Sequence, residues 1–203
     1  RLREDTVTTV TTNTYTTMVG DFVNDAKQLV ENAWDWSNLR STLTITTAAD
    51  DYTYSLTGYQ DQGKILNMVN DTSNIVMEYK PQTWFDDKFL VNTPTSGAPQ
   101  YYTFSGIDGS GDAQIDVYPK PDGVYSIKVK SVIRNVPLSS DSDTLAIPSQ
   151  PVIHMAVALL ARERGETGGT SAPEYFGIAD KYLSDAIALD AQKHPEETIF
   201  YTP

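Results

Sequence analysis

The period of the hydrophobic pattern changes twice along this chain, and no other feature constrains the fold as strongly. Residues 18–36 place apolar side chains three and four positions apart, a spacing that predicts an amphipathic helix. Between residues 42 and 136, polar and apolar side chains alternate in short runs separated by turn residues, which predicts strands. The helical spacing returns from residue 149 to residue 190. One helix therefore precedes a strand-rich insertion, and two helices follow it.

The strand-rich insertion contains six or seven short β-patterned runs, which predict an antiparallel sandwich or a small barrel. In the longest run, residues 125–136, Ile127 and Val129 lie on one face and Lys128 on the other. Residues 108–112 (Asp-Gly-Ser-Gly-Asp) predict a hairpin turn, because the ligand spacing and the closing Glu of a calcium loop are missing.

We therefore predict an α+β fold with three parts. Residues 1–40 and 145–193 form a helical bundle, residues 41–144 form an inserted antiparallel β-sandwich or barrel-like module, and residues 194–203 form an extended C-terminal arm. Within the bundle, the almost continuously apolar residues 152–161 predict a buried helix.

The N-terminal residues carry a different composition. Residues 6–17 are rich in threonine and contain further β-branched side chains, which predicts either a strand or an extended arm. The first residue is Arg1 rather than Met, and residues 1–5 are typical of the end of a helix. Either the N-terminus was processed or residues upstream of Arg1 are missing, and the helix-like residues 1–5 favour the second alternative.

Composition excludes several classes of function. The 203 residues include no cysteine, which excludes disulfide scaffolds, thiol nucleophiles and thiolate metal sites. No run of about 18 apolar residues is present, so the sequence predicts no membrane span. The formal net charge of −12 repels phosphate groups, which argues against gripping nucleic acid or a membrane surface.

The chain offers few groups for catalysis. Its two histidines are far apart in sequence: His154 within an apolar helix predicts a core or interface residue, and His194 at a helix end complements the helix dipole. The aspartate pairs 50/51, 86/87 and 141/143 lie in predicted turns. No nucleophile elbow, phosphate loop or dinucleotide signature is found. We therefore expect no catalytic residue, no cofactor, no metal and no enzymatic activity.

The first half of the chain carries two motifs in a characteristic order. The predicted first helix reads Gly20-Asp-Phe-Val-Asn-Asp-Ala-Lys27 and runs on to Asn32-Ala-Trp-Asp-Trp-Ser37. A threonine-rich strand and the strand motif Tyr54-Ser-Leu56 follow it. This order of N-D-A, D-W and Y-x-L resembles the opening of phage head-to-tail adaptor (connector) proteins.

The second half continues the resemblance. Ile115-Asp-Val-Tyr-Pro-Lys-Pro-Asp122 is similar to a strand and turn of that family, and Leu145-Ala-Ile-Pro148 leads into the apolar helix. Residues 175–190 then look like the last helix of the family's closing pair. The resemblance covers roughly residues 17–190; the upstream helix of the family and the tail after His194 are not matched.

The resemblance implies a structural protein of the virion, located in the neck between the portal vertex and the tail. Such proteins form a ring, usually twelve-fold, that joins the portal to tail nozzle, tail tube or fibre proteins and extends the channel for passing genomic DNA. It implies a portal contact at the apolar tail residues Ile199, Phe200 and Tyr201. We expect Trp34, Trp36 and His154 to lie at the interface between subunits.

Two other readings remain open at this stage. Trp34, Trp36, Trp84 and the pair Tyr101-Tyr102 would suit a carbohydrate-binding β-sandwich module of a tail protein if their rings were coplanar and faced solvent. A glycan-cleaving virion enzyme would need two carboxylates that face each other across a cleft.

Overall fold

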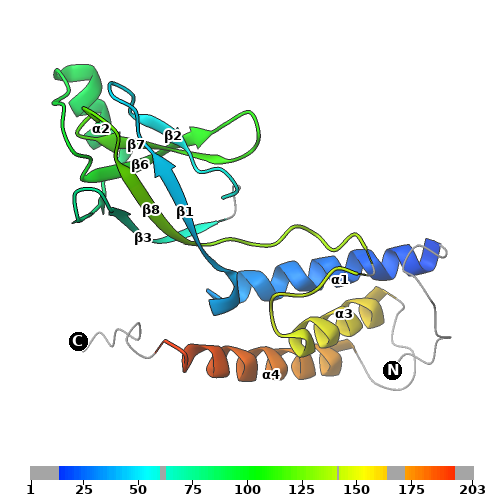
Figure 1. Ribbon diagram of the computed structural model, residues 1–203. Coiled ribbons are helices and arrows are strands. Elements are labelled where there is room, and N and C mark those ends of the chain that lie inside the picture. Colours follow the sequence, from blue (N-terminus) through cyan, green and yellow to red (C-terminus); the bar gives the residue numbers. More distant parts are fainter. Residues whose placement is uncertain (1–13, 60–62, 141, 164–171, 195–203) are drawn as a thin grey trace. The chain divides into compact units, whose positions relative to one another are not determined.

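The computed structural model describes residues 14–59, 63–140, 142–163 and 172–194 (Figure 1). The chain divides into a helical unit, made of residues up to 39 and from 135 onward, and a β unit made of residues 40–134. The predicted α+β class is therefore confirmed, since the described residues form helices in the first unit and two four-stranded sheets in the second.

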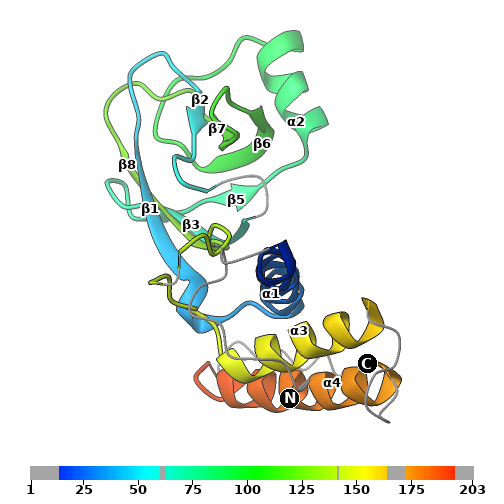
Figure 2. The ribbon, with the colours of Figure 1, turned by 90° about the vertical axis from the view of Figure 1, so that its right-hand side faces the viewer.

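The helical unit contains three long helices, of which the middle one packs against both others. These are α1 (Thr14–Ala33), α3 (Ser149–Glu163) and α4 (Ala172–Ala191). Figures 1 and 2 show α3 between α1 and α4. Eight of the residues of α3 are buried, while Ala26 and Val30 of α1 and Ala179 of α4 have no exposed surface. A helix covered on two sides needs apolar residues on both, which explains the almost continuous apolar run at 152–161.

The first helix begins earlier than its hydrophobic pattern predicted. It starts at Thr14, so residues 14–17 (Thr-Tyr-Thr-Thr) are helical and the expectation of a strand or arm at these four positions is wrong. Thr16 is buried, and this packing outweighs the modest helix propensity of threonine. The helix ends at Ala33, and the short helix η1 (Ser37–Leu39) leads into the first strand.

The β unit consists of two sheets that share one hydrophobic core. The first sheet has the order β1 (Arg40–Thr46), β8 (Ser126–Val132), β3 (Lys64–Asn70) and β4 (Ile75–Val76). The second has the order β2 (Thr53–Ser55), β7 (Ala113–Tyr118), β6 (Tyr101–Ile107) and β5 (Glu78–Tyr79). Ile127 and Val129 from the first sheet meet Ile115 and Val117 from the second in the core. This arrangement is compatible with the predicted sandwich.

A short helical segment, α2 (Gln82–Asp86) followed by η2 (Asp87–Val91), is seated on the second sheet by aromatic side chains. Trp84 makes an edge-to-face contact with Tyr118 at a ring-centroid distance of 5.2 Å and lies 5.1 Å from Tyr101. Phe85 is 1% exposed and Phe89 packs edge-on against Tyr118. Tyr118, the tyrosine of the Tyr-Pro motif, therefore supports this segment by packing against Trp84 and Phe89.

Replacing Phe85 tests that seating. We expect Phe85→Ala to lower the free energy of unfolding by about 3–5 kcal/mol, because it removes a buried aromatic ring and leaves a cavity. Leu90, in the same segment, is 79% exposed, and we expect Leu90→Ala to change stability by less than about 0.5 kcal/mol. Chemical denaturation followed by tryptophan fluorescence measures both; equal effects would contradict this account of the segment.

Candidate functional site

The N-D-A motif of α1 binds the segment through which the chain returns from the β unit. Asn24 Nδ2 donates to the carbonyl of Leu138 at 3.0 Å, and the amide of Leu138 donates to Asn24 Oδ1 at 2.8 Å. Lys27 Nζ donates to the carbonyl of Asn135 at 2.7 Å. Because an Asn side chain offers the same donor and acceptor as a peptide group, Asn24 pairs with Leu138 as a strand would.

Lys27 also belongs to a buried ion pair on α1. Its Nζ lies 3.1 Å from Oε1 of Glu31, one helical turn away, and both residues are 4% exposed. Removing one partner of such a pair leaves an uncompensated charge in the interior, which costs about 3–5 kcal/mol in typical proteins. The ammonium group therefore fixes both its own helix and the returning segment.

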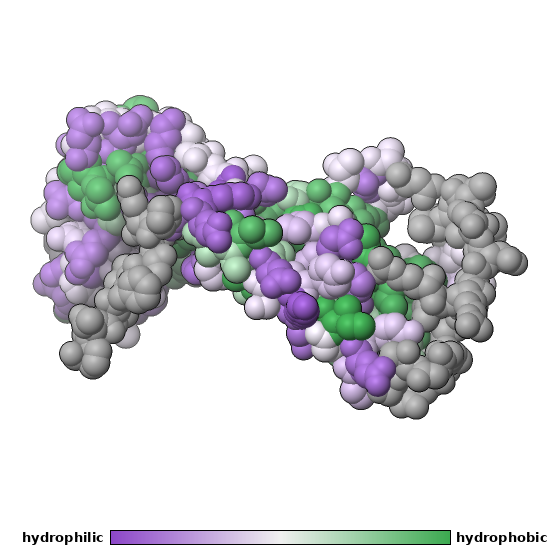
Figure 3. All heavy atoms as spheres, turned by 90° about the horizontal axis from the view of Figure 1, so that it is seen from below, coloured by the Kyte–Doolittle hydropathy of each residue, from purple (hydrophilic) through white to green (hydrophobic). Residues whose placement is uncertain are grey.

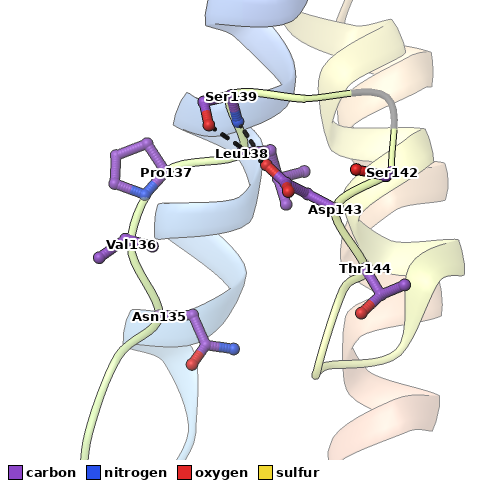
Figure 4. A pocket seen from close by; sticks show the side chains of 8 residues that line it. All are labelled: Asn135, Val136, Pro137, Leu138, Ser139, Ser142, Asp143 and Thr144. Atoms are coloured by element: carbon purple, nitrogen blue, oxygen red, sulfur yellow. Dashed lines mark hydrogen bonds between the residues drawn. The ribbon is translucent and has the colours of Figure 1, made fainter.

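The described residues of the returning segment, 135–140 and 142–144, form a hollowed loop next to α1 (Figure 4). Asp143 closes the loop, because its carboxylate accepts hydrogen bonds from the backbone amides of Ser139 at 2.7 Å and Ser140 at 2.9 Å. These bonds lower the pKa of Asp143 below its usual range. Asp143 is thus a loop-closing residue in this structure.

Trp34 and Trp36 follow α1 directly and differ in exposure. Trp36 is 1% exposed and its Nε1 donates to the carbonyl of Val30 at 2.8 Å, which satisfies one of the free carbonyls at the helix end. It is part of the chain's own packing and offers a neighbouring subunit no surface in this conformation. Trp34 is 37% exposed and donates from Nε1 to Asp190 Oδ2 at 3.2 Å.

Asp190 connects the ends of α1 and α4. Its carboxylate, 6% exposed, accepts hydrogen bonds from the amide of Ser37 at 2.9 Å and from Lys193 Nζ at 2.9 Å, and also from the Ser37 hydroxyl. Burial by itself would raise the pKa of Asp190, but the donors of Ser37 and Lys193 outweigh it and lower the pKa to about 2. The carboxylate is therefore ionised and holds the two helix ends together.

His154 lies on α3, where its ring stacks on Tyr182 of α4 at 4.1 Å with an interplanar angle of 8°. Tyr182 is 40% exposed and belongs to an exposed apolar row on α4 with Ile178 and Leu189, which are 43% and 66% exposed. We call Ile178, Tyr182 and Leu189 the α4 row. When Asp185 is counted between Tyr182 and Leu189, successive positions in the row are four, three and four residues apart. This spacing is typical of a seam along which helices pack. Figure 3 shows apolar residues in green among polar ones over the helical unit.

In the predicted turn at residues 108–112, Asp108 serves its own loop, while Asp112 bonds to the turn at Gly58. Asp108 Oδ1 accepts from the amides of Ser110 at 2.8 Å and Asp112 at 3.0 Å, and these bonds lower its pKa. Asp112 Oδ1 in turn accepts from the amide of Gly58 at 3.0 Å. No group of three or more His, Cys, Asp or Glu residues that could hold a metal ion occurs among the described residues.

Trp84 and Tyr101, two of the aromatic residues considered for sugar binding, pack against each other at an interplanar angle of 59° and are not coplanar. Trp84 meets its neighbours Phe85 and Tyr118 edge-to-face, at interplanar angles of 66° and 89°. Tyr102 packs partly buried against the core shared by the two sheets. None of the helices within the described ranges is long and apolar enough to cross a membrane.

Sequence patterns did not indicate the polar residues that matter most in this unit. Asp190 was predicted only as part of a helix, because its partner Ser37 lies 153 positions away in sequence. Asn24 was noted as part of a family motif but not as a ligand of Leu138. The proposed portal residues Ile199, Phe200 and Tyr201 lie outside the described residues, as does most of the predicted arm.

Comparison with known families gives a match over nearly the whole chain. The family model described as SU10 adaptor protein covers residues 1–196 of the chain. A search of curated proteins finds no match.

The lowered pKa of Asp190 predicts how the stability of the fold depends on pH. A carboxylate whose pKa falls from 3.8 to about 2 on folding stabilises the fold above pH 4, and this stabilisation is lost as the pH falls from about 4 to 2. We expect Asp190→Asn to lower the free energy of unfolding at pH 7 by about 2 kcal/mol and to remove this part of the pH dependence. Denaturation curves of both proteins at pH 2, 4 and 7 measure the effect. A constant difference at all three values would contradict the assignment.

Proposed function

The chain belongs to the SU10 adaptor protein family, which consists of phage head-to-tail adaptors, and on this basis we propose that its copies form a closed ring joining the portal to the tail. The family match is the observation that carries the proposal. The protein acts there as a structural component of the virion neck. The ring has twelve copies in this proposal, which is the number that the family resemblance implies.

Contacts between copies come from the helical unit. In a cyclic ring each subunit meets its two neighbours through two different faces, which together must bury apolar surface. The α4 row supplies one such surface, with His154 beneath Tyr182 and with Trp34 exposed at the end of α1. In the ring, helices of adjacent copies complete the bundle that α1, α3 and α4 begin.

The two faces of the ring that lie across its axis, one toward the portal and one toward the tail, bind different partners. Residues 194–203 act as an arm that reaches the portal, and Ile199, Phe200 and Tyr201 are its contacts. Support for the arm is its composition, since three large apolar side chains near the end of a polar segment favour burial against a partner. The β unit meets the tail nozzle, tail tube or fibre proteins.

The excess of acidic residues over basic ones suits the wall of a channel through which DNA passes. A net charge of −12 repels the phosphates of passing genomic DNA, so the wall does not bind the genome while it moves. The DNA is therefore a neighbour of the protein but not a specific ligand.

One experiment tests the whole proposal. The purified protein is mixed with the portal of the same virus and imaged by negative-stain electron microscopy. We expect a second ring stacked on the portal ring, with a continuous central channel. Portal rings that remain bare at saturating protein concentrations would refute the proposed function.

Removing the arm tests the portal contact. We expect a chain that ends at Lys193 to lose docking on the portal, because the apolar residues 199–201 are gone. Asp190, Ser37 and Lys193 remain in this variant, so we expect its thermal unfolding to match that of the full chain. Co-sedimentation with portal rings measures docking, and undiminished docking would show that the contact lies elsewhere.

A charge on the α4 row tests the contact between copies. We expect Leu189→Glu to prevent ring formation on the portal, because a carboxylate in a buried apolar interface is strongly unfavourable. Ser184→Glu adds the same charge on another exposed flank of α4 and should leave rings intact. Ring counts in micrographs compare the two; rings with Leu189→Glu at the normal frequency would exclude the α4 row from the interface.

A further inference from the structure

The two sheets end in four edge strands, and one of them is much longer than the others. β4, β2 and β5 have two, three and two residues, whereas β1 has seven. An edge strand exposes unpaired backbone donors and acceptors, and proteins usually protect such edges by shortening them or covering them. Three of the four edges are protected by their shortness.

The register shows which backbone groups of β1 are unpaired. The amide of Thr47 donates to the carbonyl of Tyr125 at 3.0 Å, which continues the antiparallel pairing of β1 with β8 by one residue. Hydrogen-bonded pairs alternate along an antiparallel ladder, so Leu43 and Ile45 also bond to β8. Thr42, Thr44 and Thr46 therefore direct their N–H and C=O groups away from the sheet. Within the described ranges, no backbone group bonds to these three residues.

β1 lacks the features that usually prevent a further strand from pairing. Its register with β8 is unbroken over seven residue pairs, so no bulge twists the edge away. It contains no proline and no lysine, and its one charged residue, Arg40, is the first. The outer-facing threonines 42, 44 and 46 are exposed. The edge is thus open to a strand of matching length.

We propose that residues 6–12 of a neighbouring copy add to β1 as a fifth strand of the first sheet. This segment reads Thr-Val-Thr-Thr-Val-Thr-Thr and has the same seven-residue length as β1. All seven residues are β-branched and so suited to a strand. In each register that pairs residues 6–12 with Thr42, Thr44 and Thr46, two of the three facing residues are threonines and the third is a valine, and the threonine pairs are favourable through their hydroxyl groups. The inference rests on the proposed ring and specifies one contact within it.

The position of the segment along the chain favours another copy as the acceptor. Residues 6–12 are joined to the first residue of α1, whereas β1 follows the last residue of α1 through residues 34–39. With 20 residues, α1 separates these two points by about 30 Å. Each copy would then lend one strand and accept one, which is a head-to-tail contact that closes into a ring.

Cysteine crosslinking tests the pairing in assembled rings, and the natural chain has no cysteine to interfere. The double variant Thr9→Cys/Thr44→Cys is assembled on the portal, confirmed as rings by microscopy and then oxidised. Thr9 is the centre of its segment and Thr44 adjoins Leu43, the centre of β1, so the two positions come within one residue of facing each other in a parallel or an antiparallel pairing. Variants with the first cysteine at Thr8 or Val10 cover a register shift of one residue. We expect a ladder of covalent multimers on denaturing gels, strongest at alternate positions.

The matched control moves the second cysteine to the opposite edge of the same sheet. Val76 on β4 is 67% exposed, and we expect Thr9→Cys/Val76→Cys to give at least tenfold less crosslinking. Equal ladders, an intrachain disulfide alone or no crosslink in well-formed rings would overturn the inference but leave the ring proposal standing. Failure of the unsubstituted protein to form rings would overturn both.

Proline gives a second test that leaves the fold intact. The amide of Thr44 points away from β8, so Thr44→Pro removes a donor from the open edge without breaking the ladder. We expect this variant to unfold at nearly the wild-type temperature as a monomer but to lose ring formation. Thr44→Val, which keeps the amide, should still form rings. Rings of normal number with Thr44→Pro would overturn the inference.

Discussion

The pairing of β1 with β8 is the constraint on which the rest of the molecule depends. These are the first and last strands of the β unit, and their register runs from Arg40 opposite Val132 to Thr46 opposite Ser126. The chain therefore leaves the helical unit and returns to it at neighbouring points. The helical unit holds both crossing segments with polar contacts: Ser37 through Asp190, and residues 135–138 through Asn24 and Lys27.

The family motifs have physical explanations within the subunit. Asn24 of N-D-A pairs with Leu138, and Trp36 of D-W bonds to the end of α1. Tyr118 of the Tyr-Pro motif supports α2 and η2 through Trp84 and Phe89. The residues that carry the resemblance thus stabilise the fold, whereas the α4 row and the edge of β1 lie on the exposed surface.

The sequence was informative where structure follows from local periodicity. Alternating patterns located Ile127 and Val129 in the core of the β unit, and the apolar run at 152–161 located the buried helix. It was less informative where a residue's role depends on distant partners. Trp36 is buried by its own chain, and its place at a subunit interface stays a prediction. Thr14, Thr16 and Thr17 are helical despite their β propensity, because tertiary packing covers Thr16. No local sequence pattern marked Asp190 as important, because its partners Ser37 and Trp34 lie 153 and 156 positions away in the sequence.

The adjacency of Arg40 and Val132 also determines how the subunit carries mechanical load. A force that draws the two units apart acts on both strands at the same end and in the same direction. It therefore does not peel β1 from β8, because neither strand is pulled away from the other. The load passes instead as shear into the next strand, β3, where the hydrogen bonds of the ladder share it.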